Sequence, residues 1–344
     1  MGPVHLGNAP GDTVSTRPDK KGGDDIATQG SRGRLSVRSI FVVSGMLWLA
    51  SANAARATDI ATCGATVAAG DTGVLQADFV CPNDFFGVRL LTGSTLQLNG
   101  HSIAGGVNTF ATVLGVARVD DQAPDEGGPG RFTIVGPGEI AGPGPDPNTF
   151  VSTQACVTLQ NGRATITSLT GVIDIHGCNW GIVGYILQYN DNKAHATIDH
   201  VILHNNSQGG IEVRNLTASQ VTAYGNHDAG IHAISTAVVT DCNSHDNGGQ
   251  GVFAGRTLKG SNVTVTNNFA GAESFRTLTL TNLTATGNTE RGVEARHEKL
   301  TDSTVTGSGV VDIFTATPPR LVNTTCGTSL NSTTQATWGV CAND

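Results

Sequence analysis

A repeat of 20 to 21 residues in the second half of the chain constrains the fold more than any other feature. A glycine followed by Ile, Val or Ala recurs at this spacing, and a last step with Asp in place of Gly keeps it. A unit this short cannot bury its own apolar face, so the repeats must stack and share one core. The steps are Gly210-Ile211, Gly230-Ile231, Gly251-Val252, Gly271-Ala272, Gly292-Val293 and Asp312-Ile313.

Each repeat also shows the period of two that is typical of strands. Val201 and Leu203 alternate with polar residues, and Ile211 and Val213 do the same after the next turn. Twenty residues hold three such strands, so the sequence predicts an all-β, single-stranded, right-handed parallel β-helix. A leucine-rich horseshoe would need a Leu-x-x-Leu-x-Leu pattern, which is absent, and propeller blades are about twice as long.

An asparagine stands four residues before most of these glycine steps. Stacked coils about 4.8 Å apart would let each side-chain amide donate to the next one along the axis. The pattern therefore predicts an inward asparagine ladder, with Asn268 an equally good choice in the fourth repeat. The predicted ladder is Asn206, Asn226, Asn247, Asn267 and Asn288.

Residues 1–57 do not show the repeat and are predicted to have other roles. Three arginines precede the apolar run Ile40 to Ala50, and small residues follow it, which predicts a signal peptide over 34–57. Eleven residues at about 1.5 Å each are too few to span a bilayer. Residues 1–33 are predicted to be a disordered extension, explained by a misassigned start, and residues 58–344 to be the β-helix. Within it, 120–130 and 142–148 lack apolar periodicity and are predicted to be loops.

The charge of the predicted mature chain argues against some partners. From residue 58 onward it keeps 13 of the 20 Lys and Arg and 24 of the 28 Asp and Glu, a net charge of −11. We therefore expect no nucleic-acid partner and no binding to anionic membranes. A secreted or periplasmic monomer is the expected form.

All seven cysteines follow the predicted signal peptide, where disulfides are permitted. Cys63 with Cys81 and Cys326 with Cys341 would each close a short loop at one end of the solenoid. Two further states stay open: Cys156 and Cys178 either pair or are buried as thiols. Cys242 occupies a position that other repeats fill with Val or Leu, so we expect a buried thiol there.

Chemistry must be sought down the columns of a solenoid, because residues about twenty apart become neighbours. Six residues before the steps lie His204, Tyr224 and His245; ten before lie His200, Gln220, Asp241 and Ser261. Histidine and tyrosine can move protons near neutral pH, so we take His204, Tyr224, His245 and Asp241 as catalytic candidates. His200, Asn243 and Gln220 are candidates for substrate binding. A second outward column holds Glu212, His232 and Glu294.

Several segments together resemble a known group of proteins. They are Cys63-Gly64, Cys81-Pro82, the coil Leu96-Gln97-Leu98-Asn99-Gly100-His101-Ser102-Ile103 and the Asn-x-x-x-Gly-Ile repeats. Over residues 59 to 344 the chain resembles secreted right-handed parallel β-helix repeat proteins of the pectate-lyase-like superfamily. The resemblance implies a polysaccharide partner, and it leaves open whether the protein is an enzyme.

One local match implies a metal. Thr197-Ile198-Asp199-His200 resembles the Trp-Ile-Asp-His segment of pectate-cleaving lyases, in which the Asp binds calcium, so Asp199 becomes a calcium candidate. The chain lacks that family's Arg-x-Pro-x-x-Arg segment. Two functions stay open: a polysaccharide-binding protein with lyase or epimerase activity, and a non-catalytic, adhesin-like surface solenoid.

Overall fold

The structure is a computed structural model that describes residues 56–81, 86–105, 111–116, 130–142, 155–160, 162–185 and 194–344. All of these belong to one compact unit, residues 53–344. The predicted N-terminal extension and signal peptide, and most of both predicted loops, lie outside the described residues. The described part contains no helix long and apolar enough to cross a membrane.

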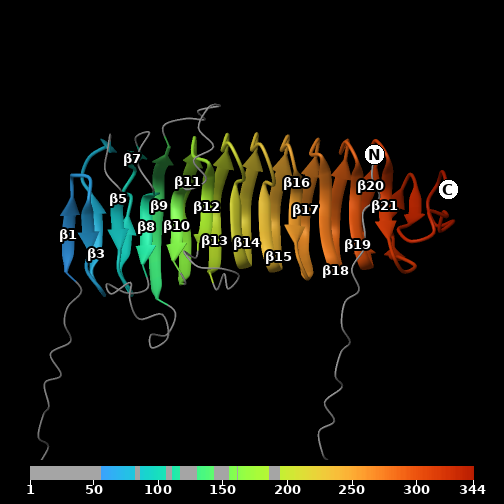
Figure 1. Cartoon of the computed structure of the whole chain (residues 1–344), viewed down its shortest axis with the longest axis horizontal. Helices are drawn as coiled ribbons and strands as arrows, with labels where there is room; N and C mark the ends of the chain where they lie inside the picture. The colour runs from blue at the N-terminus through green and yellow to red at the C-terminus, as the bar shows by residue number, and fades with distance from the viewer. Residues whose placement is uncertain are drawn as a thin grey trace, which may run out of the picture. The chain divides into compact units, whose positions relative to one another are not determined.

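The described unit is a solenoid in which every coil has three faces. We name the faces after one coil: face A holds residues 195–199, face B 201–204 and face C 211–213. Each face is a parallel sheet, because a strand pairs with the strand one coil earlier and the strand one coil later. The coils follow one another along the long axis in chain order (Figure 1). The predicted single-stranded right-handed parallel β-helix is confirmed.

The strands differ in length because many continue from one face onto the next. Short strands build the first and last coils, and long bent strands build the middle coils. The strands are β1 (Ala57–Ile60), β2 (Ala65–Val67), β3 (Thr72–Leu75), β4 (Phe79–Cys81), β5 (Phe86–Leu90), β6 (Thr95–Gln97), β7 (Ser102–Gly105), β8 (Ala111–Val116), β9 (Arg131–Ala141), β10 (Ala155–Gln160), β11 (Arg163–His176), β12 (Trp180–Tyr185), β13 (His195–His204), β14 (Ile211–Tyr224), β15 (Ile231–His245), β16 (Gln250–Ala254), β17 (Thr257–Thr266), β18 (Ala270–Thr286), β19 (Arg291–Thr301), β20 (Thr304–Thr306), β21 (Val311–Thr315), β22 (Arg320–Val322), β23 (Thr325–Cys326) and β24 (Ser329–Asn331).

The repeat places its apolar residues in one continuous core. Ile211 pairs with Ile231, and Ile231 pairs with Val252, and all three side chains are fully buried. Val201 and Leu203 on face B are buried as well. The core therefore runs down the axis as columns of like residues, as the spacing predicted.

The asparagine ladder is present and buried. Asn206 donates from Nδ2 to the Oδ1 of Asn226 at 2.9 Å, and Asn226 donates to Asn247 at 2.9 Å. Asn247 then donates to Asn268, not to Asn267, so the choice of Asn267 was wrong. The turn before Gly271 is one residue shorter than its neighbours, and the ladder keeps its distance from the end of face B. Asn288 completes the ladder as predicted.

A second polar ladder runs along the bend between faces A and B. His200, Gln220, Asp241, Asn262 and Asn282 occupy it with φ between +50° and +56°. Ser261, which the spacing put in this column, is therefore one residue too early. Asn282 donates to Asn262 at 2.8 Å and Asn262 donates to Asp241 at 2.7 Å, and these groups are exposed.

The bend between faces C and A absorbs differences in coil length. One residue, Arg214, makes this bend in β14, whereas Ile234 and Ser235 make it in β15, and the strand register shifts by one there. The opposite change occurs between β18 and β19. Columns on faces A, B and C therefore stay aligned although coils of 20 and 21 residues alternate.

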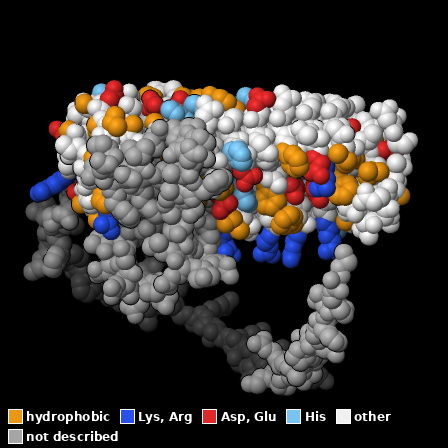
Figure 2. All heavy atoms as spheres, turned by 45° about the horizontal axis from the view of Figure 1, so that its top comes forward, with side chains coloured by type: hydrophobic (Ala, Val, Ile, Leu, Met, Phe, Trp, Pro, Cys, Tyr) orange, Lys and Arg blue, Asp and Glu red, His pale blue; other side chains and the backbone are white. Residues whose placement is uncertain are grey.

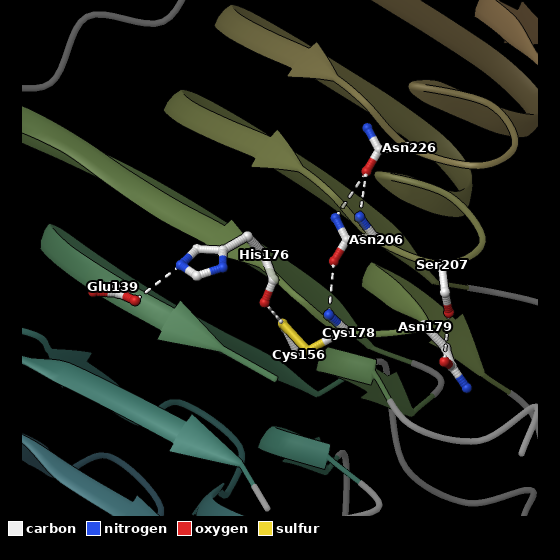
Figure 3. Close-up of a disulfide and its surroundings, with 8 residues drawn as sticks. All are labelled: Glu139, Cys156, His176, Cys178, Asn179, Asn206, Ser207 and Asn226. Carbon is white, nitrogen blue, oxygen red and sulfur yellow. Dashed lines mark hydrogen bonds and ion pairs between the residues drawn. A yellow bond between two sulfur atoms is a disulfide. The ribbon is translucent and has the colours of Figure 1, made fainter. Parts of the chain in front are cut away.

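Three disulfides are present. Cys63–Cys81 and Cys326–Cys341 close the end loops as predicted, and Cys156 pairs with Cys178 (Figure 3). Cys242 is the one free cysteine among the described residues. Burial raises the pKa of its thiol to about 11, so it is an unreactive core residue.

Candidate functional site

Four aromatic side chains stack on the outward side of face B. They are His176, His204, Tyr224 and His245, the last residues of β11, β13, β14 and β15, and we call them the ring column. Consecutive ring centroids lie 4.7, 4.8 and 5.2 Å apart. In-register parallel strands hold equivalent residues about 4.8 Å apart, which is close to the distance at which rings stack. The fold thus brings together three predicted residues and adds His176.

A carboxylate on the preceding coil approaches each of the first two histidines. His176 Nε2 lies 2.8 Å from Glu139 Oε1, as Figure 3 shows, and His204 Nε2 lies 2.9 Å from Asp174 Oδ1. Each carboxylate stands two residues before the end of its face B strand. The beginning of the ring column is therefore a row of alternating acids and imidazoles.

Asp174, His176 and His204 also form the one group of three potential metal ligands found among the described residues. Their ligand atoms all lie within 4.8 Å of one another. Asp174 Oδ1 and His204 Nδ1 are buried without a hydrogen-bond partner, and the short Asp174–His204 contact lacks hydrogen-bond geometry. Unpartnered buried atoms of this kind are what a bound ion would satisfy.

The donor set decides which ion this group suits. Two imidazoles and one carboxylate favour zinc or another first-row transition metal over calcium, which takes six or more oxygens. The two rings are nearly parallel, with 21° between their planes, so one would have to change rotamer before both could bind one ion. The predicted calcium ligand Asp199 does not belong to this group; its Oδ2 lies 2.8 Å from His200 Nδ1.

The other predicted residues do not gather in one place. Asn243 lies on face B beside Thr222, and its Oδ1 is buried without a partner, so it belongs with the ring column. Asp241, His200 and Gln220 lie at the bend between faces A and B. Asp241 accepts a hydrogen bond from Asn262 and is part of the second polar ladder.

His245 ends the ring column with a carboxylate of its own. Its Nδ1 lies 2.7 Å from Asp246 Oδ2. The hydrogen bond from His245 holds the pKa of Asp246 below its usual value, although this carboxyl is exposed. The next residue in the column is Thr266, so the stack stops there.

The sequence-based prediction did not include three residues of the site: Glu139, Asp174 and His176. A signal for two of them was available, because Ile173-Asp174-Ile175-His176 has the same alternation as Val201-Ile202-Leu203-His204. Residues 186–193 interrupt the spacing between these coils, so a count of twenty residues does not reach His176. The register shows the alignment directly, since His176 pairs with His204.

The second predicted column lies on face C. His232 Nδ1 is 3.3 Å from Glu212 Oε2, and its ring packs edge-on against Phe253. Two coils later, burial raises the pKa of Glu273, and the charge of Glu294 adds to the shift. Face C thus has acidic groups as well, separated from the ring column by the turn that carries the asparagine ladder.

Comparison with known proteins yields similarity of fold. No protein-family model matches the sequence, and no curated protein matches it. The Dettilon tailspike protein is 13% identical, with a TM-score of 0.48, over 75% of this chain and 55% of that one, so this chain spans about half the tailspike's length.

Two epimerases give lower scores. The periplasmic alginate epimerase AlgG is 11% identical, with a TM-score of 0.36 over 74% of this chain and 77% of that one. The A-module of the Azotobacter vinelandii mannuronan C-5 epimerase AlgE4 is 14% identical, with a TM-score of 0.36 over 71% and 69%. By its own strand pairing, this chain is a single-stranded right-handed parallel β-helix cross-linked by three disulfides.

Proposed function

We propose that this protein is an exported β-helix that binds a polysaccharide along face B, over the ring column. The observation that carries the proposal is the continuous stack of His176, His204, Tyr224 and His245 with carboxylates at its beginning. The ring faces cover one another, so their N–H and O–H edges are what the column offers to a ligand. A row of such groups on successive coils suits a chain of sugar hydroxyls lying along the axis.

The same groups are suited to proton transfer. In elimination at a uronic acid, a base removes the proton on C5, a double bond forms between C4 and C5, and an acid protonates the leaving oxygen on C4. His204 as base and Tyr224 as acid are stacked neighbours, 4.8 Å apart. A cation would supply the charge that the uronate carboxylate requires; Asp174 and His176 would hold it, because His204 cannot be a ligand and the base at once. Epimerisation would use the same two groups, with the proton returned to the opposite face of C5.

An extracytoplasmic location fits the covalent structure. Three pairs of cysteines form disulfides in the described part of the chain. Disulfides of this kind persist in oxidising compartments. The signal peptide predicted over 34–57 remains part of the proposal.

A non-catalytic surface solenoid is a second candidate, and a different observation favours it. After His245 the outward column continues as Thr266, Thr286 and Thr306. A row of threonines offers hydroxyl groups but no proton-transfer group near neutral pH. A rigid stalk needs no more than this regular surface.

The test is a screen of polymannuronate and polygalacturonate, with zinc, with calcium and with a chelator. Unsaturated product is followed by absorbance, epimerised product by NMR, and binding by gel retardation. We expect His204→Gln with Tyr224→Phe to weaken binding by roughly tenfold, about 1.4 kcal/mol. Thr286→Val, two coils beyond the stack, is the control. Binding that is equal in the double variant and the parent would rule out the ring column, and binding without any product would favour the stalk.

A further inference from the structure

Exposed cations gather on the last coils of face A and on the bend that leads into it. We call them the basic surface. They lie on β17, β19 and β22, on the bend just before β17, and on the bends within β18 and β19. Figure 2 shows Lys and Arg side chains side by side along one edge of the described part. The basic surface consists of Arg256, Lys259, Arg276, Arg296, Lys299 and Arg320, and all six are exposed.

The coil repeat sets the spacing of these cations. Arg256, Arg276 and Arg296 hold the bend between faces C and A in three consecutive coils; the Arg256 carbonyl accepts a hydrogen bond from Thr277 on the next coil at 3.0 Å. Lys259 and Lys299 lie in one column of face A with Thr279 between them. Positive charge therefore recurs along the axis every one or two coils, about 5 or 10 Å apart.

Acidic residues are missing from this surface. Residues 255–261, 275–281 and 295–301 contain one carboxylate, Glu298, and its side chain is buried in the core. None of the six cations forms an ion pair with a carboxylate in the described part of the chain. Like charges on neighbouring strands repel and destabilise a sheet. The row is therefore unfavourable for the sheet taken alone, and a ligand with negative charge would offset this repulsion.

We infer that the basic surface binds a linear acidic polysaccharide that carries carboxylate or sulfate groups. It lies on face A and its bend, so it is a different surface from the ring column on face B. The choice of a polysaccharide as the polymer rests on the proposed function. The requirement for negative charge, and its spacing, follow from the basic surface itself. The net charge of −11 over residues 58–344 does not exclude a polyanion, because these six cations are gathered on one surface away from the carboxylates of the ring column.

The periodicity of the surface favours a polysaccharide over other polyanions. An extended, two-fold chain of uronates turns a carboxylate to the same side at every second sugar, and Lys259 and Lys299 stand two coils apart. Thr257, Thr277 and Thr279 lie between the cations and can bond to sugar hydroxyls. Single-stranded nucleic acid favours a continuous row of aromatic platforms. Within residues 255–261, 275–281 and 295–301 the exposed rings are Phe275 and His297, and Phe275 packs edge-on against Phe253. A fluid lipid surface has no period to match.

The test compares two double variants of the full chain that lose the same charge. Arg276→Gln with Arg296→Gln removes two cations from the basic surface. Arg131→Gln with Arg163→Gln removes two exposed cations from face A on β9 and β11. Affinity for polygalacturonate and dextran sulfate is measured at low and high salt, with neutral dextran as the reference polymer. We expect the first pair to weaken binding roughly tenfold and to flatten the salt dependence, and the second pair to change little.

Each other outcome overturns the inference. Equal losses in both pairs would mean that net charge alone acts. No binding by the parent chain would mean that the basic surface has no polyanionic ligand. Tighter binding to a single-stranded oligonucleotide or to phosphatidylglycerol vesicles than to either polymer would mean that its ligand is a nucleic acid or a membrane. His204→Gln with Tyr224→Phe separates the two sites: if this pair alone abolishes binding, the ring column stands and the basic surface falls.

Discussion

Face B carries two kinds of surface on one backbone. From His176 to His245 its outward column is a stack of rings, and from Thr266 to Thr306 the same column is threonine. Strand pairing continues without a break across the change, and both halves lie beside the same asparagine ladder. The threonine half shows that the fold does not require a ring at this position. The rings are therefore the part of the column that a ligand would explain.

The largest effect is expected from a buried carboxyl, Glu298, in the core of the coils that carry the threonine column. Glu298 occupies a core position that Leu258 and Leu278 fill in the preceding coils, and both of its oxygens are buried without partners. Burial raises the pKa of this carboxyl to about 8. In the unfolded chain it ionises near pH 4.5, so stability falls as pH rises from about 4.5 to 8 and levels off above that.

Replacing Glu298 should remove this weakness. Glu298→Leu is expected to stabilise the protein above pH 8 by several kcal/mol, on the order of 5, and far less at pH 4. Urea unfolding from pH 4 to 9 measures the difference. Glu298→Gln is the matched control, since it removes the charge and keeps a buried polar group. A parent chain whose stability does not change between pH 5 and 8 would contradict the assignment.

The second largest effect on stability is expected in the asparagine ladder, which runs beside both the rings and the threonines. Asn247→Ala removes the acceptor of the Asn226 amide and the donor to Asn268, and leaves buried groups unpaired. We expect a loss of roughly 3 kcal/mol in the free energy of unfolding. Asn267→Gly, at the exposed residue beside the ladder, should cost well under about 1 kcal/mol. Similar losses in the two variants would mean that Asn267 belongs to the ladder after all.

Turning the ring half into the threonine half should cost little stability. Tyr224→Thr removes two stacking contacts and installs the residue that the later coils accept at this position. We expect a loss of about 1–2 kcal/mol, measured by urea unfolding, with the circular dichroism spectrum unchanged. Thr286→Tyr is the reciprocal control and should also fold. Collapse of the fold in Tyr224→Thr would show that the rings are structural.

The smallest effect is expected at the exposed ladder. Asn262→Gly keeps the positive φ and removes one hydrogen bond to Asp241 and one from Asn282. Water replaces these partners at the surface, so the expected loss is less than about 1 kcal/mol by urea unfolding. A loss as large as that of Asn247→Ala would show that the two ladders are equivalent despite their different burial.

Most of the fold could be predicted, because it depends on period. Residues such as Ile211 and Val213 repeat at a fixed distance, and stacking follows from their spacing alone. The errors came from counting back from the glycine steps. One shorter turn before Gly271 moved Asn267 into the ladder and Ser261 into the outer column, although the backbone places Asn268 and Asn262 there.

The site could be predicted in part. His204, Tyr224 and His245 share a column because their coils are regular, and the structure brings them together. His176 and Asp174 belong to a coil that is separated from the next by residues 186–193, which breaks the count. The sequence grouped Asp241 with the ring column, whereas the structure places it at a bend with positive φ, which a residue count does not distinguish from a strand face.

The bend between faces C and A is the place where the solenoid tolerates a change in coil length. Coils can gain a residue there, between Val213 and Asn215 or between Ser274 and Thr277, without moving any column. The segment 186–193 joins β12 on face C to β13 on face A, so it enters the chain at this same place. New sequence can be grafted at such a junction while the core keeps its register. A change of length at this bend therefore leaves the columns of faces A, B and C in register.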